Sequence, residues 1–347
     1  MKKFLALLIL ILCIACGVYL FSLYNLLDSY FNKEDNPHLS LEIDATFDKT
    51  EKGEGLYSVY INDNLRESFD NFFDAVKYAE EKKRAIIKEN KEGHIIWSNY
   101  PDFSVIIGNT ESEFANFSAA LQFASSNKGS VIIYKKTDTI IWEDQGEKPG
   151  GVFIEAPMIK QLPELARGCE VTSLAMLLNY NGITADKMEL AEKIHKNPNE
   201  YSIKNGIKYS GNPHRGFVGD IYNFRNHGLG VYNEPIFELL SEYTDKGLNY
   251  TGCDFSDLYY SLNNSQPIWV IINTSYSYLP ESSFETWLTE DGEIKITYKE
   301  HSVLVTGYDE NYIYFNDPYG LKKSAPKRDF IEAWVQMGSQ AIGMVIE

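Results

Sequence analysis

Four residues in the second half of the chain are of the types that carry out covalent catalysis by a thiol. Gln161 lies 8 positions before Cys169, His301 lies 132 positions after the cysteine, and Asp317 follows 16 positions later. A thiol nucleophile, an imidazole base, a carboxylate that orients the base and an amide that stabilises an oxyanion together make up such a site. The sequence therefore predicts a candidate thiol site built from these four residues.

Cys169 is predicted to begin an amphipathic helix, and this position suits a reactive thiol. Val171, Leu174 and Leu178 recur at helical spacing, and Gly182 follows as a natural end of the helix. The first turn of a helix has unpaired backbone N–H groups and the positive end of the dipole, both of which favour a thiolate. Free cysteine is nevertheless among the most buried residue types, so this assignment depends on the other three residues.

His301 and Asp317 are predicted to lie at the open end of one β-hairpin. With a three-residue turn at 309–311, residues whose numbers sum to 620 face each other, and both side chains then lie on the same face. A two-residue turn would place them on opposite faces, so a catalytic pair requires an odd-numbered loop or a bulge. A histidine on an apolar strand is more often a satisfied core residue, and an Asp-Pro dipeptide is typical of an ordinary turn.

In combination these motifs resemble the papain-like cysteine peptidases related to bacteriocin-leader-processing peptidases, in the stand-alone branch outside the transporter-fused enzymes. The resemblance covers roughly residues 152–347. It is carried by QLPEL from Gln161, GCEVTSLAMLLNYNG from Gly168, GNPHRGFVGD from Gly211, EHSVLVTGYD from Glu300 and NDPYG from Asn316.

The resemblance implies an α+β domain in which an N-terminal cysteine helix packs on an antiparallel sheet. It implies that Cys169 is the nucleophile, His301 the general base and acid, Asp317 the orienting acid and Gln161 the oxyanion donor. No metal or organic cofactor is implied. The chain has no phosphate-loop motif and no further apolar spans, so cleavage of leader peptides during export is not expected.

Three functions are compatible with these residues. The leading interpretation is a thiol peptidase acting on a peptide or protein substrate. A cell-wall peptide hydrolase or amidase would use the same site, and a papain-like scaffold that only binds a ligand would have no need of all four residues. The loop from Gly211 is expected to border the cleft, and the aromatic-rich stretch 275–293 to form either a rim or lid or a hydrophobic plug over the core.

The N-terminal 40 residues are predicted to be a signal anchor and a stalk. The uncharged apolar run Phe4–Phe21 has 18 residues, close to the ~20 that span a bilayer, and Lys2 and Lys3 precede it. The chain after it would then lie outside the cytoplasm. A lipoprotein anchored through Cys16 and a cleaved signal peptide are the alternatives.

The composition limits the class of partner. The formal net charge is −17, which argues against nucleic acid and against docking on anionic lipid through charge. Only Cys169 and Cys253 lie outside the apolar run, and a disulfide between them would consume the predicted nucleophile. An exported chain rich in Lys, Asn, Ile and Tyr without a disulfide framework is typical of a Gram-positive bacterium.

An internal repeat precedes the predicted catalytic domain. Residues at about 57–99 match residues at 103–144 with a constant offset of 45, and the shared pattern is interpreted as strand–helix–strand–strand. One copy is too small for a robust core, so the two are expected to stack as one domain over 41–150. They carry no catalytic cluster and are expected to be a spacer or an interaction module, and the peptidase-like domain is expected at 151–347.

Periodicity indicates the remaining elements of that domain. We expect an extended segment at 152–160, helices near 169–181, 185–195, 219–226, 255–263 and 327–335, and strands at 229–233, 267–273, 294–299, 302–309, 312–316 and 341–346.

Overall fold

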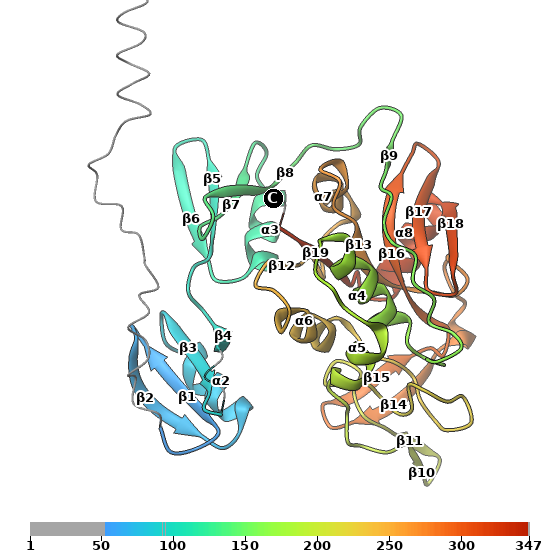
Figure 1. Cartoon of the computed structure of the whole chain (residues 1–347), viewed down its shortest axis with the longest axis horizontal. Coiled ribbons are helices and arrows are strands. Elements are labelled where there is room, and N and C mark those ends of the chain that lie inside the picture. Colours follow the sequence, from blue (N-terminus) through green and yellow to red (C-terminus); the bar gives the residue numbers. More distant parts are fainter. Residues whose placement is uncertain (1–52, 92, 94, 346–347) are drawn as a thin grey trace, which may run out of the picture.

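The computed structural model describes residues 53–91, 93 and 95–345 (Figure 1). The predicted signal anchor and stalk lie outside these residues. Within the described part of the chain, no helix is long and apolar enough to cross a membrane.

A seven-stranded antiparallel sheet forms the centre of the C-terminal part. Its order is β12-β19-β13-β16-β17-β18, and β9 pairs with β16 at its side. These strands are β9 (Val152–Phe153), β12 (Gly247–Asn249), β13 (Ile268–Asn273), β16 (Glu300–Tyr308), β17 (Tyr312–Asp317), β18 (Leu321–Pro326) and β19 (Ala341–Met344).

Helices cover both faces of this sheet. They are α4 (Cys169–Tyr180), α5 (Lys187–Lys193), α6 (Asn233–Ser241), η2 (Phe255–Leu258), α7 (Tyr259–Asn263) and α8 (Lys327–Gln336). Side chains alternate between the faces of a strand. Ile271 and Leu304 therefore share a core with α4, α5 and α6, whereas Val270 and Val303 share one with α7 and α8. The predicted α+β arrangement, with the cysteine helix on an antiparallel sheet, describes this mixed fold.

The register of the β16–β17 hairpin depends on one bulge. Next to the turn, Tyr308 pairs with Ile313, but beyond Thr306 the pairs are Val305 with Phe315 and then Leu304 with Asn316. The predicted three-residue turn is therefore wrong, because the numbers of the paired residues next to the turn sum to 621 and not to 620. The bulge restores the sum of 620 toward the open end, as the prediction required. The Thr306 carbonyl accepts a hydrogen bond from Ile154 N–H (2.7 Å), so β9 supports the bulge.

Two predicted elements near residue 225 are wrong. The segment 219–226 contains turns in place of a helix, and 229–233 contains no strand, since α6 begins at Asn233. The Arg167 guanidinium donates to the backbone carbonyls of Asp220, Asn223 and Asn226, and this cation therefore fixes the segment as a loop.

A smaller sheet lies at the bottom of Figure 1, at the end of the molecule away from the segment 144–151 that leads into β9. Its strands are β10 (Ser202–Lys204), β11 (Ile207–Tyr209), β14 (Glu285–Thr289) and β15 (Gly292–Ile296), and η3 (Glu281–Ser283) precedes β14. Trp287 of β14 is fully buried against Val218 and Ile296, so this part of the aromatic stretch 275–293 plugs a small core of its own. Tyr278, by contrast, is 64% exposed.

Each repeat forms a four-stranded sheet with one helix. The first contains β1 (Tyr57–Ile61), β2 (Asn64–Phe69), α2 (Phe72–Glu80), β3 (Ala85–Glu89) and β4 (Ile95–Ser98). The second contains β5 (Phe103–Ile107), β6 (Thr110–Phe114), α3 (Phe117–Ser125), β7 (Val131–Tyr134) and β8 (Thr139–Glu143). The predicted strand–helix–strand–strand pattern misses the edge strands β2 and β6. These strands are largely exposed and lack an apolar alternation, and only the positive-φ turn at Asn62-Asp63 marks the first of them.

The two copies do not stack on each other, so this prediction is also wrong. The first has its own small core around Val59, Ala79 and Ile87. The second shares the core of the peptidase-like part, where Phe117 contacts Tyr250 with ring centroids 4.8 Å apart. Small residues on α3 permit this approach. Ser118 and Ala119 occupy the positions of Phe73 and Asp74 in the first copy, and Ser118 Oγ donates to the Asn249 carbonyl (2.7 Å).

Candidate active site

His301 and Asp317 form a buried hydrogen-bonded pair at the open end of the β16–β17 hairpin. His301 Nε2 lies 3.0 Å from Asp317 Oδ1, and their exposed fractions are 1% and 0%. Asp317 also accepts hydrogen bonds from Tyr319 N–H (2.8 Å), Tyr276 Oη (2.5 Å) and Lys323 Nζ (2.7 Å). Burial raises the pKa of Asp317, but the bonds from His301, Lys323 and Tyr276 outweigh it and hold this pKa well below its usual range.

This pairing leaves one imidazole nitrogen available. Within the described residues, Nδ1 of His301 makes no hydrogen bond. The Tyr319 ring stacks on the imidazole at 5.0 Å between centroids with planes 15° apart, and Tyr319 is 44% exposed. Tyr319 therefore lies between His301 and solvent. The arrangement fixes the ring and its tautomer, with a proton on Nε2 directed at Asp317.

Cys169 is the first residue of α4, where the predicted helix begins. Gly168 precedes it as the N-cap and provides no side-chain hydrogen bond. In the described part of the chain, the Cys169 backbone N–H has no hydrogen-bond acceptor. An unpaired N–H at a helix start can stabilise negative charge, so this group suits an oxyanion or a thiolate.

The thiol of Cys169 is hydrogen-bonded to a carboxylate and not to the imidazole. Its Sγ donates to Glu170 Oε2 (3.1 Å), and no hydrogen bond joins it to His301 among residues 53–91, 93 and 95–345. The other Glu170 oxygen accepts from Val231 N–H (2.7 Å). Burial raises the pKa of the Cys169 thiol well above its usual value, and the neighbouring Glu170 and Glu300 carboxylates raise it further.

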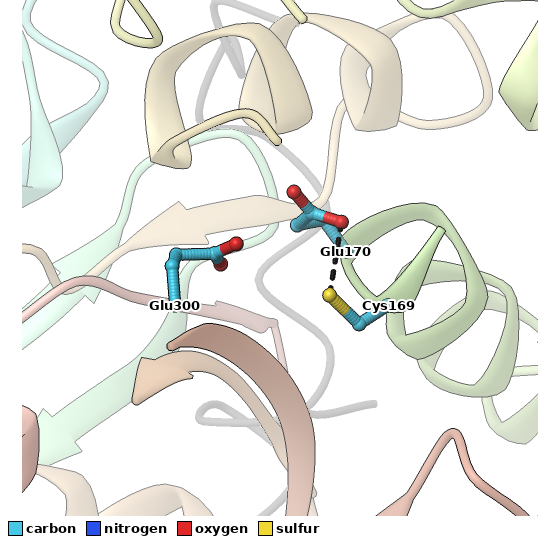
Figure 2. A group of neighbouring side chains, drawn as sticks. All are labelled: Cys169, Glu170 and Glu300. Carbon is cyan, nitrogen blue, oxygen red and sulfur yellow. Dashed lines mark hydrogen bonds between the residues drawn. The ribbon is translucent and has the colours of Figure 1, made fainter. Parts of the chain in front are cut away.

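Glu170 and Glu300 form a buried carboxylate pair beside the thiol (Figure 2). Burial raises the pKa of Glu170 to about 7, and burial together with Glu170 raises that of Glu300. Alternation along β16 explains this placement, because Glu300 and Ser302 face α4 while His301 faces the other way. The sequence reasoning missed both acids. The available signal was that each directly adjoins a predicted site residue, in the dipeptides Cys169-Glu170 and Glu300-His301.

Gln161 is buried in the loop that leads to α4. Its Nε2 donates to the Leu165 and Ala166 carbonyls at 3.3 and 3.2 Å, and its Oε1 has no partner among the described residues. Its backbone N–H donates to the Pro318 carbonyl (2.8 Å), next to Asp317. Gln161 therefore ties the loop before Cys169 to the end of β17, and both amide hydrogens point at loop carbonyls.

The loop from Gly211 reaches the site because its Val218 pairs with the segment around Gly230. Val218 N–H donates to Gly230 O and Leu229 N–H donates to Val218 O, both at 2.9 Å. A β-carbon at Gly230 would collide with Glu170 Oε1 and Glu300 Oε2, so the absence of a side chain there makes room for the two carboxylates.

The profile of the Peptidase_C39 like family matches residues 153–342, and the chain belongs to this family. This agrees with the predicted resemblance and supports a cysteine peptidase. The uncharacterized protein YvpB of Bacillus subtilis (strain 168) is 48% identical over 182 residues, which cover 52% of this chain and 70% of YvpB. The crystal structure of a candidate C39-like peptidase from Bacillus anthracis is 45% identical, with a TM-score of 0.53. The match covers 57% of this chain and 98% of that protein.

Proposed function

We propose that this protein is a cysteine peptidase that hydrolyses peptide bonds through Cys169, His301 and Asp317. One observation carries the proposal. A buried carboxylate fixes the His301 imidazole through Nε2 and leaves Nδ1 available. The Tyr319 ring stacks on this imidazole. Burial raises the pKa of Tyr319, and the Cys169 thiol is close enough to raise it further, so both side chains lie beside Tyr319. The family supports the same chemistry.

The proposed reaction begins with rotation of the Cys169 side chain from Glu170 toward His301 Nδ1. The thiol proton passes to Nδ1, and Sγ attacks the carbonyl carbon of the substrate. The Cys169 backbone N–H stabilises the oxyanion, and the Gln161 amide joins it by leaving its loop carbonyls. His301 then gives its proton to the departing amine, and a water molecule that it deprotonates releases the acyl group.

We infer a peptide or protein substrate, with cell-wall peptides included, and a catalytic part outside the cytoplasm that is attached through the apolar run Phe4–Phe21 or through Cys16. The apolar run and the two lysines before it support this location. The net charge of −17 supports a partner other than nucleic acid.

The test is hydrolysis of a mixed library of fluorogenic peptides by the full-length chain. Cys169→Ala and His301→Ala should each lower kcat/KM by at least about 10³-fold, because they remove the nucleophile and its base. Cys253→Ala is the matched control, since it removes the other described thiol and should leave turnover unchanged. Undiminished cleavage by Cys169→Ala would contradict the proposal.

A further inference from the structure

Three potential ligand atoms converge beside the helix start, from two elements of the fold. Cys169 and Glu170 are the first two residues of α4, and Glu300 is the first residue of β16. Their exposed fractions are 7%, 0% and 8%, and one donor atom from each lies within 4.8 Å of the others. Figure 2 shows the Glu300 carboxylate directed toward the side of the cluster where Glu170 and the Cys169 sulfur lie.

The Glu300 carboxylate is unpartnered in the described part of the chain. It forms no hydrogen bond or ion pair there, and its buried Oε1 has no hydrogen-bond partner. No lysine, arginine or histidine among these residues pairs with Glu170 either, whose bonds come from Cys169 and Val231. An ionised carboxylate in such a site costs several kcal/mol unless a cation accompanies it, which is why burial raises the pKa values of both acids. The cluster therefore lacks a counter-charge.

We propose that Cys169, Glu170 and Glu300 form a binding site for one Zn²⁺ ion. A divalent cation at their centre supplies the missing positive charge and gives the Glu300 carboxylate a partner. The ligand set indicates zinc, because Mg²⁺ and Ca²⁺ take oxygen ligands whereas a thiolate ligand favours softer ions. Three protein ligands with a fourth position open is an arrangement that Zn²⁺ accepts.

The surroundings of the three ligands support a defined site. Val231 N–H donates to one oxygen of Glu170 and so orients this carboxylate, as hydrogen-bond donors behind metal ligands do. The missing side chain of Gly230 leaves room for both carboxylates. Helix α4 and strand β16 pack through a common core, so the positions of the ligands do not depend on a flexible loop.

Zinc bound here would block the thiol. Coordination replaces the S–H bond by a metal–sulfur bond and releases the thiol proton to solvent. This bond engages the Sγ electron pair that the proposed reaction needs, so a loaded molecule is a latent peptidase and removal of the ion frees Cys169. Binding itself does not depend on peptidase activity. Failure of one proposal is therefore distinguishable from failure of the other.

The test uses the full-length chain with Cys13, Cys16 and Cys253 replaced by serine, stripped of metal and titrated with Co²⁺. We expect one equivalent to produce a thiolate-to-cobalt charge-transfer band, and Zn²⁺ to displace the Co²⁺ and abolish the band. Zinc should also slow alkylation of Cys169 by iodoacetamide at least about tenfold, since a metal-bound sulfur is a poor nucleophile.

Matched variants assign the ligands. Glu300→Gln should weaken cobalt binding at least about tenfold, while Glu155→Gln, whose side chain is 87% exposed, should have no effect. Gly230→Ala keeps all three ligands but obstructs the two carboxylates, and it should weaken binding as well. Circular dichroism reports whether each variant is folded. Absence of the band in the folded parent, or a band that Glu300→Gln leaves unchanged, would overturn the zinc site.

Discussion

The His301 imidazole is held by two contacts of different kinds, the hydrogen bond to Asp317 and the stacked Tyr319 ring. The hydrogen bond sets which nitrogen carries the proton, and the ring limits the tilt of the imidazole. In the proposed reaction, therefore, Tyr319 is a positioning residue, and its hydroxyl is less important than its ring.

Substitutions of Tyr319 test this role. Tyr319→Ala should lower kcat/KM by about tenfold, because an aromatic pair contributes about 0.5–1.5 kcal/mol. Tyr319→Phe keeps the ring and should stay within about twofold of the parent. Kinetics on a peptide substrate, with kcat and KM determined separately, provide the measurement. Equal losses in both variants would show that the hydroxyl, and not the stacked ring, is responsible.

Asp317 should make folding stability depend on pH. Its pKa is depressed in the folded state, so it contributes stability that is present above the unfolded pKa of about 3.9 and is lost as pH falls. At pH 7 we expect Asp317→Asn to lower the free energy of unfolding by about 3 kcal/mol, since it leaves buried partners unpaired. Urea unfolding at several pH values measures this difference. It should shrink below pH ~4, and a difference that grows on acidification would contradict the assignment.

At the scale of elements, the bulge at Thr306 sets the register in which His301 and Asp317 share a face. Thr306 is the extra residue of the bulge, so its deletion makes Gly307 and Val305 consecutive opposite Tyr314 and Phe315 and keeps the pairs beyond them. We therefore expect His301 and Asp317 to remain on one face, and peptidase activity to survive this deletion.

The matched comparison is deletion of Ser302, which lies between the bulge and His301 on β16. This deletion turns the His301 side chain to the other face of the strand and should abolish peptidase activity. Both shortened chains should be compared for activity and for helix and strand content by circular dichroism. Loss of activity on deletion of Thr306 in a folded chain, or activity that survives deletion of Ser302, would contradict this register.

Sequence patterns identified the strongly apolar elements and failed where tertiary contacts decide. The α4 helix, β13 and the β16–β17 hairpin are buried and strongly patterned, so periodicity was sufficient for them. The loop at 219–226 is held by the Arg167 side chain from a distant position, and β2 and β6 are exposed edges with little apolar signal.

The same limit applies to the site. Spacing and resemblance indicated Cys169, His301, Asp317 and Gln161, and the structure joins His301 to Asp317. It does not show Cys169 bonded to His301, and it directs the Gln161 amide at loop carbonyls. A residue's partner depends on which strand face it occupies, and the sequence does not state which face α4 covers.

At the scale of the whole molecule, the two repeats differ in what they stabilise. Phe117 of the second repeat is buried against Tyr250, whereas Phe72, its counterpart in the first, is only partly buried within a separate small core. The second repeat thus belongs structurally to the peptidase-like part.

Paired substitutions test this difference. Phe117→Ala should destabilise the peptidase-like part by about 3–5 kcal/mol, the usual cost of removing a buried aromatic ring. Phe72→Ala should leave the unfolding of the peptidase-like part unchanged, because the neighbours of Phe72 lie within the first repeat. Thermal unfolding, monitored through the loss of activity, distinguishes the two variants. Equal shifts of the unfolding midpoint in both would show that the repeats unfold as one unit with the peptidase-like part.

The separate core of the first repeat has a mechanical consequence. If the N-terminus is held at a surface, tension on the chain reaches the first repeat before it reaches the second. That repeat has only a small core of its own, and its Phe73 ring touches the Arg215 guanidinium of the peptidase-like part. Under load it would extend first and lengthen the tether, while the second repeat and the proposed catalytic residues stay intact.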